Sequence, residues 1–126
     1  MLIDDHEADN FYHQYVFQRM GVTEKVEIAE NGFDALAFLK KENQSPPELI
    51  FLDINMPKMN GWEFLDEYRQ LSEEQKSRVI ILMLTTSVNP ADRKKAETVP
   101  EINGYYSKPL NDAKLKEILE IYFPEY

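Results

Sequence analysis

Four positions carry charged or hydroxyl side chains directly after short apolar runs of the sequence. The runs are MLI, LIFL, VIILML and GYYS, and the residues that follow them are Asp4 with Asp5, Asp53, Thr85 and Lys108. Burying a lone carboxylate is strongly unfavourable unless it is paired, metal-bound or protonated. Asp53 therefore needs a compensating partner from another part of the chain.

The residue types at these positions favour phosphoryl chemistry. Three carboxylates close together are tolerable only with a cation, and oxygen ligands of this kind suit Mg²⁺. Asp53 is the candidate nucleophile, because a carboxylate can accept a phosphoryl group and form an aspartyl phosphate. Transfer also requires neutralisation of the phosphoryl oxygens, which Mg²⁺, Lys108 and the Thr85 hydroxyl would share.

The elements that must position these side chains are short strands separated by amphipathic helices. The strands are expected at residues 1–3, 25–29, 48–52, 78–84 and 104–107, with five helices between and after them. Such alternation predicts a parallel sheet. In a parallel sheet the carboxyl ends of the strands meet at one edge, so the four positions are expected to converge.

Local signals mark several helix ends. Asn60 and Glu63 form a candidate capping box, and Asn89 followed by Pro90 is typical of a helix start. The last helix has one apolar face, formed by Leu115, Ile118, Leu119 and Tyr122. These signals predict where two helices begin and which face of the last helix is buried.

The first helix contains aromatic residues that we interpret as part of the core. They are Phe11, Tyr12, Tyr15 and Phe17. Asp9 and Asp34 are interpreted as helix caps, since acidic residues after a strand often have this role. His6 and His13 are expected to be solvated or packed side chains without a chemical role.

Composition narrows the class of protein. A chain of 126 residues suits one domain, residues 1–126, with no separate output domain. The net charge of −9 argues against direct nucleic-acid binding, which depends mainly on Lys and Arg. There is no cysteine, and no apolar run approaches the about 20 residues that span a bilayer. We therefore expect a cytoplasmic protein without membrane insertion.

The order of the motifs resembles that of the response-regulator receiver domain, the phosphoacceptor half of two-component signalling. Asp4-Asp5 matches the acidic pair, LIFLDINMPKMNG the phosphoacceptor strand, Thr85 in LMLTTS the hydroxyl position, and Lys108 in YYSKPL the lysine. AENGFDAL, residues 29–36, is similar to the family's second strand and helix. The resemblance covers almost the whole chain. It implies an α/β, flavodoxin-like doubly wound sheet of five parallel strands, order 2-1-3-4-5, with helices on both faces.

The resemblance also implies roles for individual residues. Asp53 would be the phosphoacceptor, with Lys108 and Thr85 beside the phosphoryl group. Mg²⁺ would be held directly by Asp5, Asp53 and the backbone carbonyl of Asn55, and through water by Asp4. The first strand is expected to be short, because only three residues precede Asp4.

Signal transfer follows from the same resemblance. A sensor histidine kinase or a histidine phosphotransfer protein would donate the phosphoryl group. Thr85 and Tyr105 would act as the switch, and a downstream protein would bind the face of the fourth helix, fifth strand and fifth helix. The protein would promote its own phosphorylation and dephosphorylation and would not be an enzyme with a separate substrate.

Three other functions share parts of this pattern. A Mg²⁺-dependent phosphatase of the haloacid-dehalogenase kind also uses an aspartyl nucleophile, but usually has a second aspartate two residues on, where Asn55 stands. A flavin-binding electron carrier has the same strand order, but DDHEAD would repel the cofactor's phosphate. A receiver-like scaffold without phosphorylation would not need the complete set of Asp4, Asp5, Asp53, Thr85 and Lys108.

Overall fold

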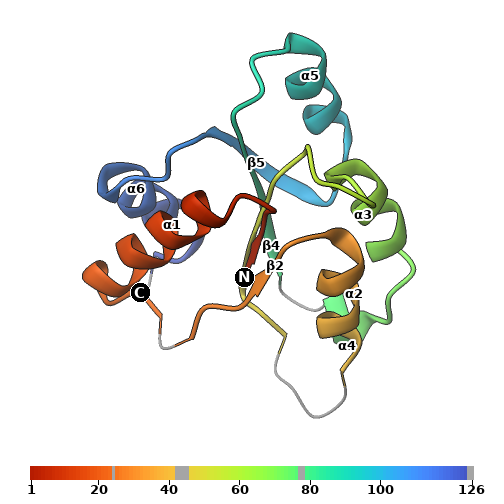
Figure 1. Ribbon diagram of the computed structural model, residues 1–126, viewed down its shortest axis with the longest axis horizontal. Coiled ribbons are helices and arrows are strands. Elements are labelled where there is room, and N and C mark those ends of the chain that lie inside the picture. The colour runs from red at the N-terminus through yellow and green to blue at the C-terminus, as the bar shows by residue number, and fades with distance from the viewer. Residues whose placement is uncertain (24, 42–45, 77–78, 125–126) are drawn as a thin grey trace.

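A five-stranded parallel sheet runs through the centre of the molecule (Figure 1). The computed structural model describes residues 1–126 except 24, 42–45, 77–78 and 125–126. The strands are β1 (Leu2–Ile3), β2 (Ile28–Ala29), β3 (Leu49–Leu52), β4 (Ile80–Thr85) and β5 (Ile102–Ser107). Their order, β2-β1-β3-β4-β5, confirms the predicted 2-1-3-4-5 sheet.

The described residues form six helices, one more than predicted. They are α1 (Glu7–Met20), α2 (Gly32–Lys40), α3 (Gly61–Tyr68), α4 (Glu73–Lys76), α5 (Pro90–Thr98) and α6 (Asp112–Tyr122). The additional helix, α4, is a single turn with no buried residue, so it has no apolar periodicity by which to predict it. Within the described residues, no helix is both long and apolar enough to cross a membrane.

Helices cover both faces of the sheet, as predicted: α1 and α6 lie on one side, and α2 and α3 on the other (Figure 1). Successive strand residues alternate between two cores. Leu2, Phe51 and Leu82 belong to the core that includes residues of α1 and α6. Ile3, Leu52 and Met83 belong to the core that includes residues of α2 and α3. This alternation follows from the two-residue period of a strand.

The strand register brings the predicted site residues to one edge. Ile3 pairs with Leu52, so the residues that follow them, Asp4 and Asp53, leave the sheet side by side. Thr85 pairs with Ser107, and the Lys108 N–H donates to the Thr85 carbonyl oxygen at 3.0 Å. The ends of β1, β3, β4 and β5 therefore present their side chains to the same volume.

The first two strands are shorter than the predicted segments. The short β1 confirms the expectation for the first strand, and β2 is limited in turn because β1 is its partner in the sheet. The Met1 ammonium donates to the Leu49 carbonyl oxygen at 2.7 Å, and burial lowers the pKa of this amine to about 6. At the start of the predicted strand 78–84, Arg78 lies outside the described residues, and β4 begins at Ile80.

The predicted capping box and the predicted cap at Asn89 are confirmed, whereas α2 is capped by Asn31, whose side chain accepts the Asp34 N–H at 2.9 Å, so the interpretation of Asp34 as the cap is wrong. The Asn60 side chain accepts the Glu63 N–H at 2.9 Å, and the Glu63 carboxylate accepts the Asn60 N–H at 3.1 Å. The Asn89 side chain accepts the Ala91 N–H at 3.0 Å. In α6, the predicted apolar face is directed inward, with two residues buried and two partly buried: Leu115, Ile118, Leu119 and Tyr122.

The core interpretation of the α1 aromatics is wrong for three of the four residues. Phe11, Tyr12 and Tyr15 are 75%, 39% and 50% exposed, and only Phe17 is buried. The inner face of α1 is instead formed by Asn10, His13, Val16 and Phe17. The Asn10 amide donates to the Asp4 carbonyl oxygen at 2.9 Å, so this polar side chain is satisfied inside. Because polar residues form part of the inner face, a prediction based on hydropathy assigns the inner face of α1 to the wrong residues.

Candidate functional site

The carboxyl edge of the sheet gathers four groups that could hold a metal ion. Single ligand atoms of Asp4, Asp5, His6 and Asp53 all lie within 4.8 Å of one another. They come from the end of β1, the turn into α1 and the end of β3. Three of the four were predicted as metal ligands, and His6 was not.

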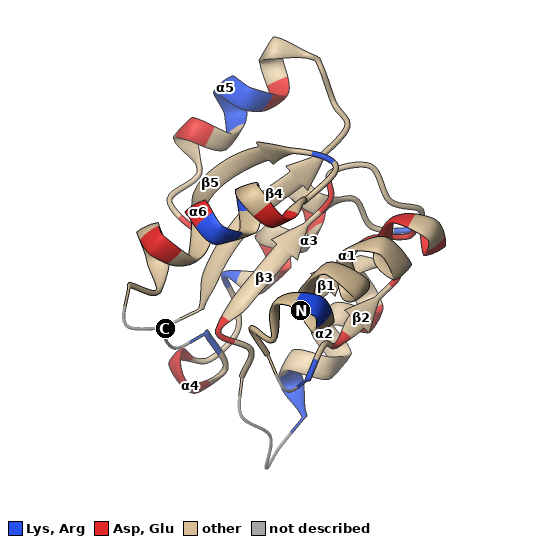
Figure 2. Cartoon of the chain, turned by 90° about the vertical axis from the view of Figure 1, so that its left-hand side faces the viewer, with Lys and Arg blue, Asp and Glu red and all other residues tan. Residues whose placement is uncertain are grey.

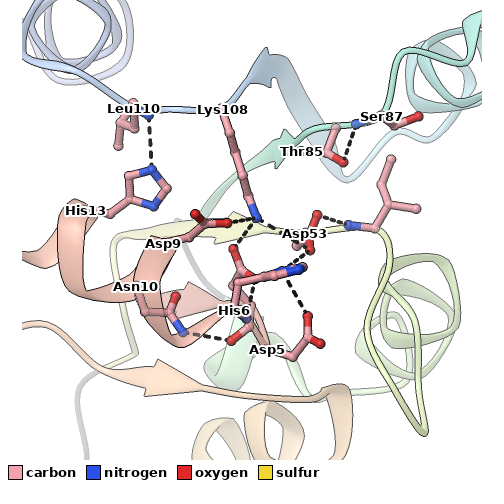
Figure 3. Close-up of polar contacts among 12 residues, drawn as sticks. Asp5, His6, Asp9, Asn10, His13, Asp53, Thr85, Ser87, Lys108 and Leu110 are labelled. Atoms are coloured by element: carbon pink, nitrogen blue, oxygen red, sulfur yellow. Dashed lines mark hydrogen bonds and ion pairs between the residues drawn. The ribbon is translucent and has the colours of Figure 1, made fainter.

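Lys108 supplies the positive charge next to these carboxylates (Figure 3). Its Nζ atom lies 2.6 Å from Asp4 Oδ2, 3.0 Å from Asp9 Oδ2 and 3.7 Å from Asp53 Oδ2. Burial acts to lower the pKa of the ammonium, but the bonds to Asp4 and Asp9 outweigh it, so the pKa is raised. Lys108 therefore remains a cation although its side chain is only 5% exposed.

Asp53 is buried at the end of β3, with 4% of its surface exposed. Its Oδ1 atom accepts the Ile54 N–H at 2.9 Å, which fixes the orientation of the carboxylate and leaves Oδ2 toward Lys108. Burial raises the pKa of Asp53, and the charge of Lys108 opposes this rise. A raised pKa means a more basic oxygen, which suits a nucleophile.

Thr85 and Asn55 flank this centre in different ways. Thr85 is buried, and its hydroxyl oxygen accepts the Ser87 N–H at 3.1 Å. This contact leaves the hydroxyl proton free to be donated. Asn55 is exposed in the segment after β3, and its backbone carbonyl as a metal ligand stays a prediction.

Asp9 and His6 are site residues that sequence reasoning missed. Asp9 lies in the first turn of α1, where His6 holds the N-cap position, and its carboxylate pairs with Lys108, so the interpretation of Asp9 as a cap is wrong. His6 Nδ1 lies 3.2 Å from Asp4 Oδ1. The sequence offers little signal for this role of Asp9, because its partner Lys108 is 99 residues away.

His13 is packed, as predicted, and it has a structural task. Its Nε2 atom accepts the Leu110 N–H at 3.1 Å, which ties the segment after β5 to α1. Burial lowers the pKa of His13, and the charge of Lys108 acts in the same direction. The neutral ring is therefore the form that accepts this hydrogen bond.

The geometry agrees with comparisons to known proteins. A family model described as the response regulator receiver domain matches residues 1–120. The chain belongs to this family. Receiver domains are the phosphoacceptors of two-component signalling and pair with histidine kinases, and the predicted family and fold are thereby confirmed.

Individual relatives match over nearly the whole receiver domain. The response regulator Rcp1 of Synechocystis sp. is 32% identical over 125 residues, which is 96% of this chain and 81% of that protein. A two-component response regulator from Cytophaga hutchinsonii superposes with a TM-score of 0.84 at 30% identity, covering 98% and 94% of the two chains. The receiver domain of a Pseudomonas aeruginosa sensor histidine kinase, solved with magnesium in its active-site cleft, has a TM-score of 0.77 at 25% identity, covering 96% and 93%.

In this receiver domain, the segment after β5 is anchored on both sides of Lys108. The Lys108–Pro109 peptide bond is cis. The Lys114 ammonium donates to the Ser107 carbonyl oxygen at 2.7 Å and to the Pro109 carbonyl oxygen at 3.2 Å. Together with the His13–Leu110 bond, these contacts fix the backbone that carries the lysine.

The start of α3 packs closely on the backbone of the phosphoacceptor position. The Gly61 N–H donates to the Ile54 carbonyl oxygen at 2.8 Å. A Cβ atom at position 61 would lie 2.5 Å from the Asp53 carbonyl oxygen and 3.1 Å from Ile54 Cα. A side chain at this position would therefore displace backbone that orients Asp53.

Gly61→Ala is expected to destabilise the receiver by about 1–3 kcal/mol, the usual cost of overpacking, and to weaken Mg²⁺ binding. Gly21→Ala is the matched control. Gly21 has a φ of 62°, so alanine is strained there, but among the described residues its Cβ would meet nothing within 4 Å. Denaturant unfolding and Mg²⁺ titration calorimetry of both variants check the prediction. Equal metal affinity of the two variants would contradict it.

Proposed function

We propose that this receiver domain accepts a phosphoryl group on Asp53 from a histidine kinase or a histidine phosphotransfer protein in the cytoplasm. The observation that carries the proposal is the position of the Lys108 ammonium, 2.6 Å from Asp4 and 3.7 Å from Asp53. A cation at this point offsets the acidic cluster and would also contact an incoming phosphoryl group.

The donor set fits Mg²⁺. Asp5 Oδ1 is buried and has no hydrogen-bond partner among the described residues, so it is free to bind an ion. Asp4 is already engaged, since Oδ1 accepts the His6 N–H and Oδ2 pairs with Lys108. This difference supports Asp5 as a direct ligand and Asp4 as a ligand through water. The magnesium in the Pseudomonas aeruginosa receiver also supports an ion here.

The chain's own residues would carry out phosphoryl transfer in one displacement. The Asp53 carboxylate attacks phosphorus, the P–N bond to the donor imidazole breaks, and the imidazole leaves with the electron pair and takes up a proton. Lys108 and the Thr85 hydroxyl donate to the phosphoryl oxygens, and Mg²⁺, when bound, neutralises further charge. Attack of water on phosphorus later releases phosphate and restores the carboxylate.

This function predicts Mg²⁺-dependent labelling of the protein by an acyl-phosphate donor or a phosphorylated histidine kinase domain. Excess chelator should stop the labelling, because the phosphoryl group would then face uncompensated carboxylates. Labelling that persists undiminished in chelator would remove Mg²⁺ from the proposal. Turnover of an added phosphomonoester without labelling of the protein would favour the phosphatase alternative instead.

Thr85 and Tyr105 are proposed to transmit the change to a partner. The Tyr105 hydroxyl is buried and has no hydrogen-bond partner among the described residues, which costs about 1–3 kcal/mol. This cost weakens the preference for the buried, inward position of the ring, so the outward position lies closer to it in free energy. If Thr85 moves toward the phosphoryl oxygens, the space it leaves would favour the inward ring, which is a two-state response.

The surface that would respond consists of α5, β5 and α6, which are the predicted fourth helix, fifth strand and fifth helix. Figure 2 shows basic segments beside acidic ones on both helices. These basic residues are Arg93, Lys94, Lys95, Lys114 and Lys116. Their charge suits a protein partner with acidic contacts, whereas the net charge of −9 disfavours nucleic acid.

The switch is tested by the rotamer of Tyr105 in NMR spectra, with and without beryllofluoride and Mg²⁺. We expect the mimic to increase the inward population in the wild type and to leave it unchanged in Thr85→Ala. Thr85→Ser, which retains the hydroxyl, should respond like the wild type. Identical Tyr105 rotamer populations in the free and beryllofluoride-bound wild type would contradict the switch.

A further inference from the structure

The imidazole of His6 lies among the carboxylates of the metal site. Its Nδ1 atom is 3.2 Å from Asp4 Oδ1, 3.4 Å from Asp5 Oδ1 and 3.9 Å from Asp53 Oδ2. The backbone N–H of His6 also donates to Asp4 Oδ1 at 2.9 Å, which holds the residue beside the site (Figure 3). His6 is thus the one nitrogen ligand in a group of four candidate ligands.

These distances lie within the range of separations between ligands of a single octahedral ion. With metal–ligand bonds of about 2.1 Å, neighbouring ligands lie about 3.0 Å apart and opposite ligands about 4.2 Å apart. All three separations from His6 Nδ1 fall between these limits. Asp5 Oδ1, the buried oxygen without a partner in the described part of the chain, is among the three atoms. One ion could therefore contact His6 together with Asp5 and Asp53, the two carboxylates proposed as direct ligands.

The ring is held by the site and not by the helix that follows it, since Nδ1 forms a hydrogen bond with Asp4 Oδ1 at 3.2 Å. His6 precedes α1 at the N-cap, but its side chain makes no capping hydrogen bond to the described residues of the helix. The side chain is 58% exposed, so it contributes little to the core. A substitution at His6 is therefore expected to leave the structure intact.

We infer that His6 Nδ1 is a nitrogen ligand of the ion at this site, and that it raises the affinity for first-row transition-metal dications relative to the affinity for Mg²⁺. The inference rests on the metal site of the proposed function and adds the class of ion. Mg²⁺ selects oxygen ligands, whereas imidazole binds well to Mn²⁺, Ni²⁺ and related ions. His6 would be the residue that sets this preference.

The inference predicts graded effects of His6 substitution on affinity, measured by calorimetry with Mg²⁺, Mn²⁺ and Ni²⁺. Mutation of a residue that only hydrogen-bonds a metal ligand typically lowers metal affinity about 10- to 100-fold. Loss of a direct ligand should therefore weaken Ni²⁺ binding at least about tenfold. Mn²⁺ binding should weaken less, and Mg²⁺ binding least, following the order of nitrogen affinity. His6→Ala and His6→Phe should behave alike, because Phe retains a ring but no ligand atom.

Other roles of His6 give different patterns. If the ring only blocks the site, His6→Ala should strengthen binding of all three ions while His6→Phe does not. If the ring acts only through charge, both variants should change the three affinities by the same factor. Either pattern would overturn the inference.

Spectroscopy of bound Mn²⁺ tests the ligand directly. In protein labelled with ¹⁵N-histidine, pulsed electron paramagnetic resonance should detect ¹⁵N coupled to Mn²⁺ in the wild type and lose it in His6→Phe. The other histidine, His13, is 1% exposed and bonded to Leu110, so it does not compete for the ion. Absence of nitrogen coupling in the wild type would refute the inference. This signal does not depend on phosphorylation, so a failure to label Asp53 would refute the proposed function alone.

Discussion

Asp53→Asn is expected to abolish labelling of the receiver domain by a phosphoryl donor in Mg²⁺. The amide retains the size of the side chain but provides no carboxylate oxygen to attack phosphorus. The variant should remain folded, because the carboxylate is buried and carries a raised pKa in the folded state. Removing this charge should therefore leave the stability of the metal-free protein unchanged or higher.

The measurement is incorporation of ³²P from a labelled donor, combined with thermal unfolding of the same samples. Asp34→Asn is the matched control, since Asp34 lies in the first turn of α2 and is not among the grouped ligands. It should take up label like the wild type. Full labelling of a folded Asp53→Asn variant would show that another residue is the acceptor.

Lys108→Ala is expected to lower both phosphoryl uptake and stability. Removal of one partner of a buried ion pair costs about 3–5 kcal/mol. The Asp9 side chain is 40% exposed and can be rehydrated, so we expect a cost at or just below the lower end of this range, about 2–3 kcal/mol. Uptake should fall because the cluster and the phosphoryl oxygens both lose their fixed cation.

Mg²⁺ should restore part of the lost stability in Lys108→Ala, because an ion that binds only the folded state stabilises it. The same ion should restore less of the phosphoryl uptake, since the lysine also contacts the phosphoryl group. Unfolding in urea with and without Mg²⁺ separates the two effects. Lys116→Ala, on the exposed side of α6, is the control. A Lys108→Ala variant with normal stability and normal labelling would refute the role of Lys108.

The sequence was sufficient to predict the sheet and the main site residues, because both depend on local patterns. The central strands β3 and β4 are short apolar runs, and Asp53, Thr85 and Lys108 directly follow the runs LIFL, VIILML and GYYS. Once the sheet is parallel, the ends of the runs must meet at one edge. The actual register, with Ile3 opposite Leu52, brings Asp4 next to Asp53 without any further requirement.

The parts that were missed depend on contacts between distant segments. Asn10 and His13 occupy the inner face of α1 because Asp4 and Leu110 supply their hydrogen-bond partners. Hydropathy assigns this face to aromatic residues instead, and Phe11 is in fact 75% exposed. Asp9 could be read as a cap because its pairing with Lys108 spans 99 residues of sequence.

Mapping of the phosphoryl group in the wild-type protein identifies the residue that accepts it. After reaction with a phosphoryl donor in Mg²⁺, reduction of the acyl phosphate with borohydride converts the modified aspartate to homoserine, which peptide mass spectrometry can locate. We expect homoserine at position 53 alone, and none after reaction in chelator. Homoserine at Asp4, Asp5 or Asp9 in place of position 53, or a phosphoryl group on a hydroxyl or imidazole side chain, would contradict it.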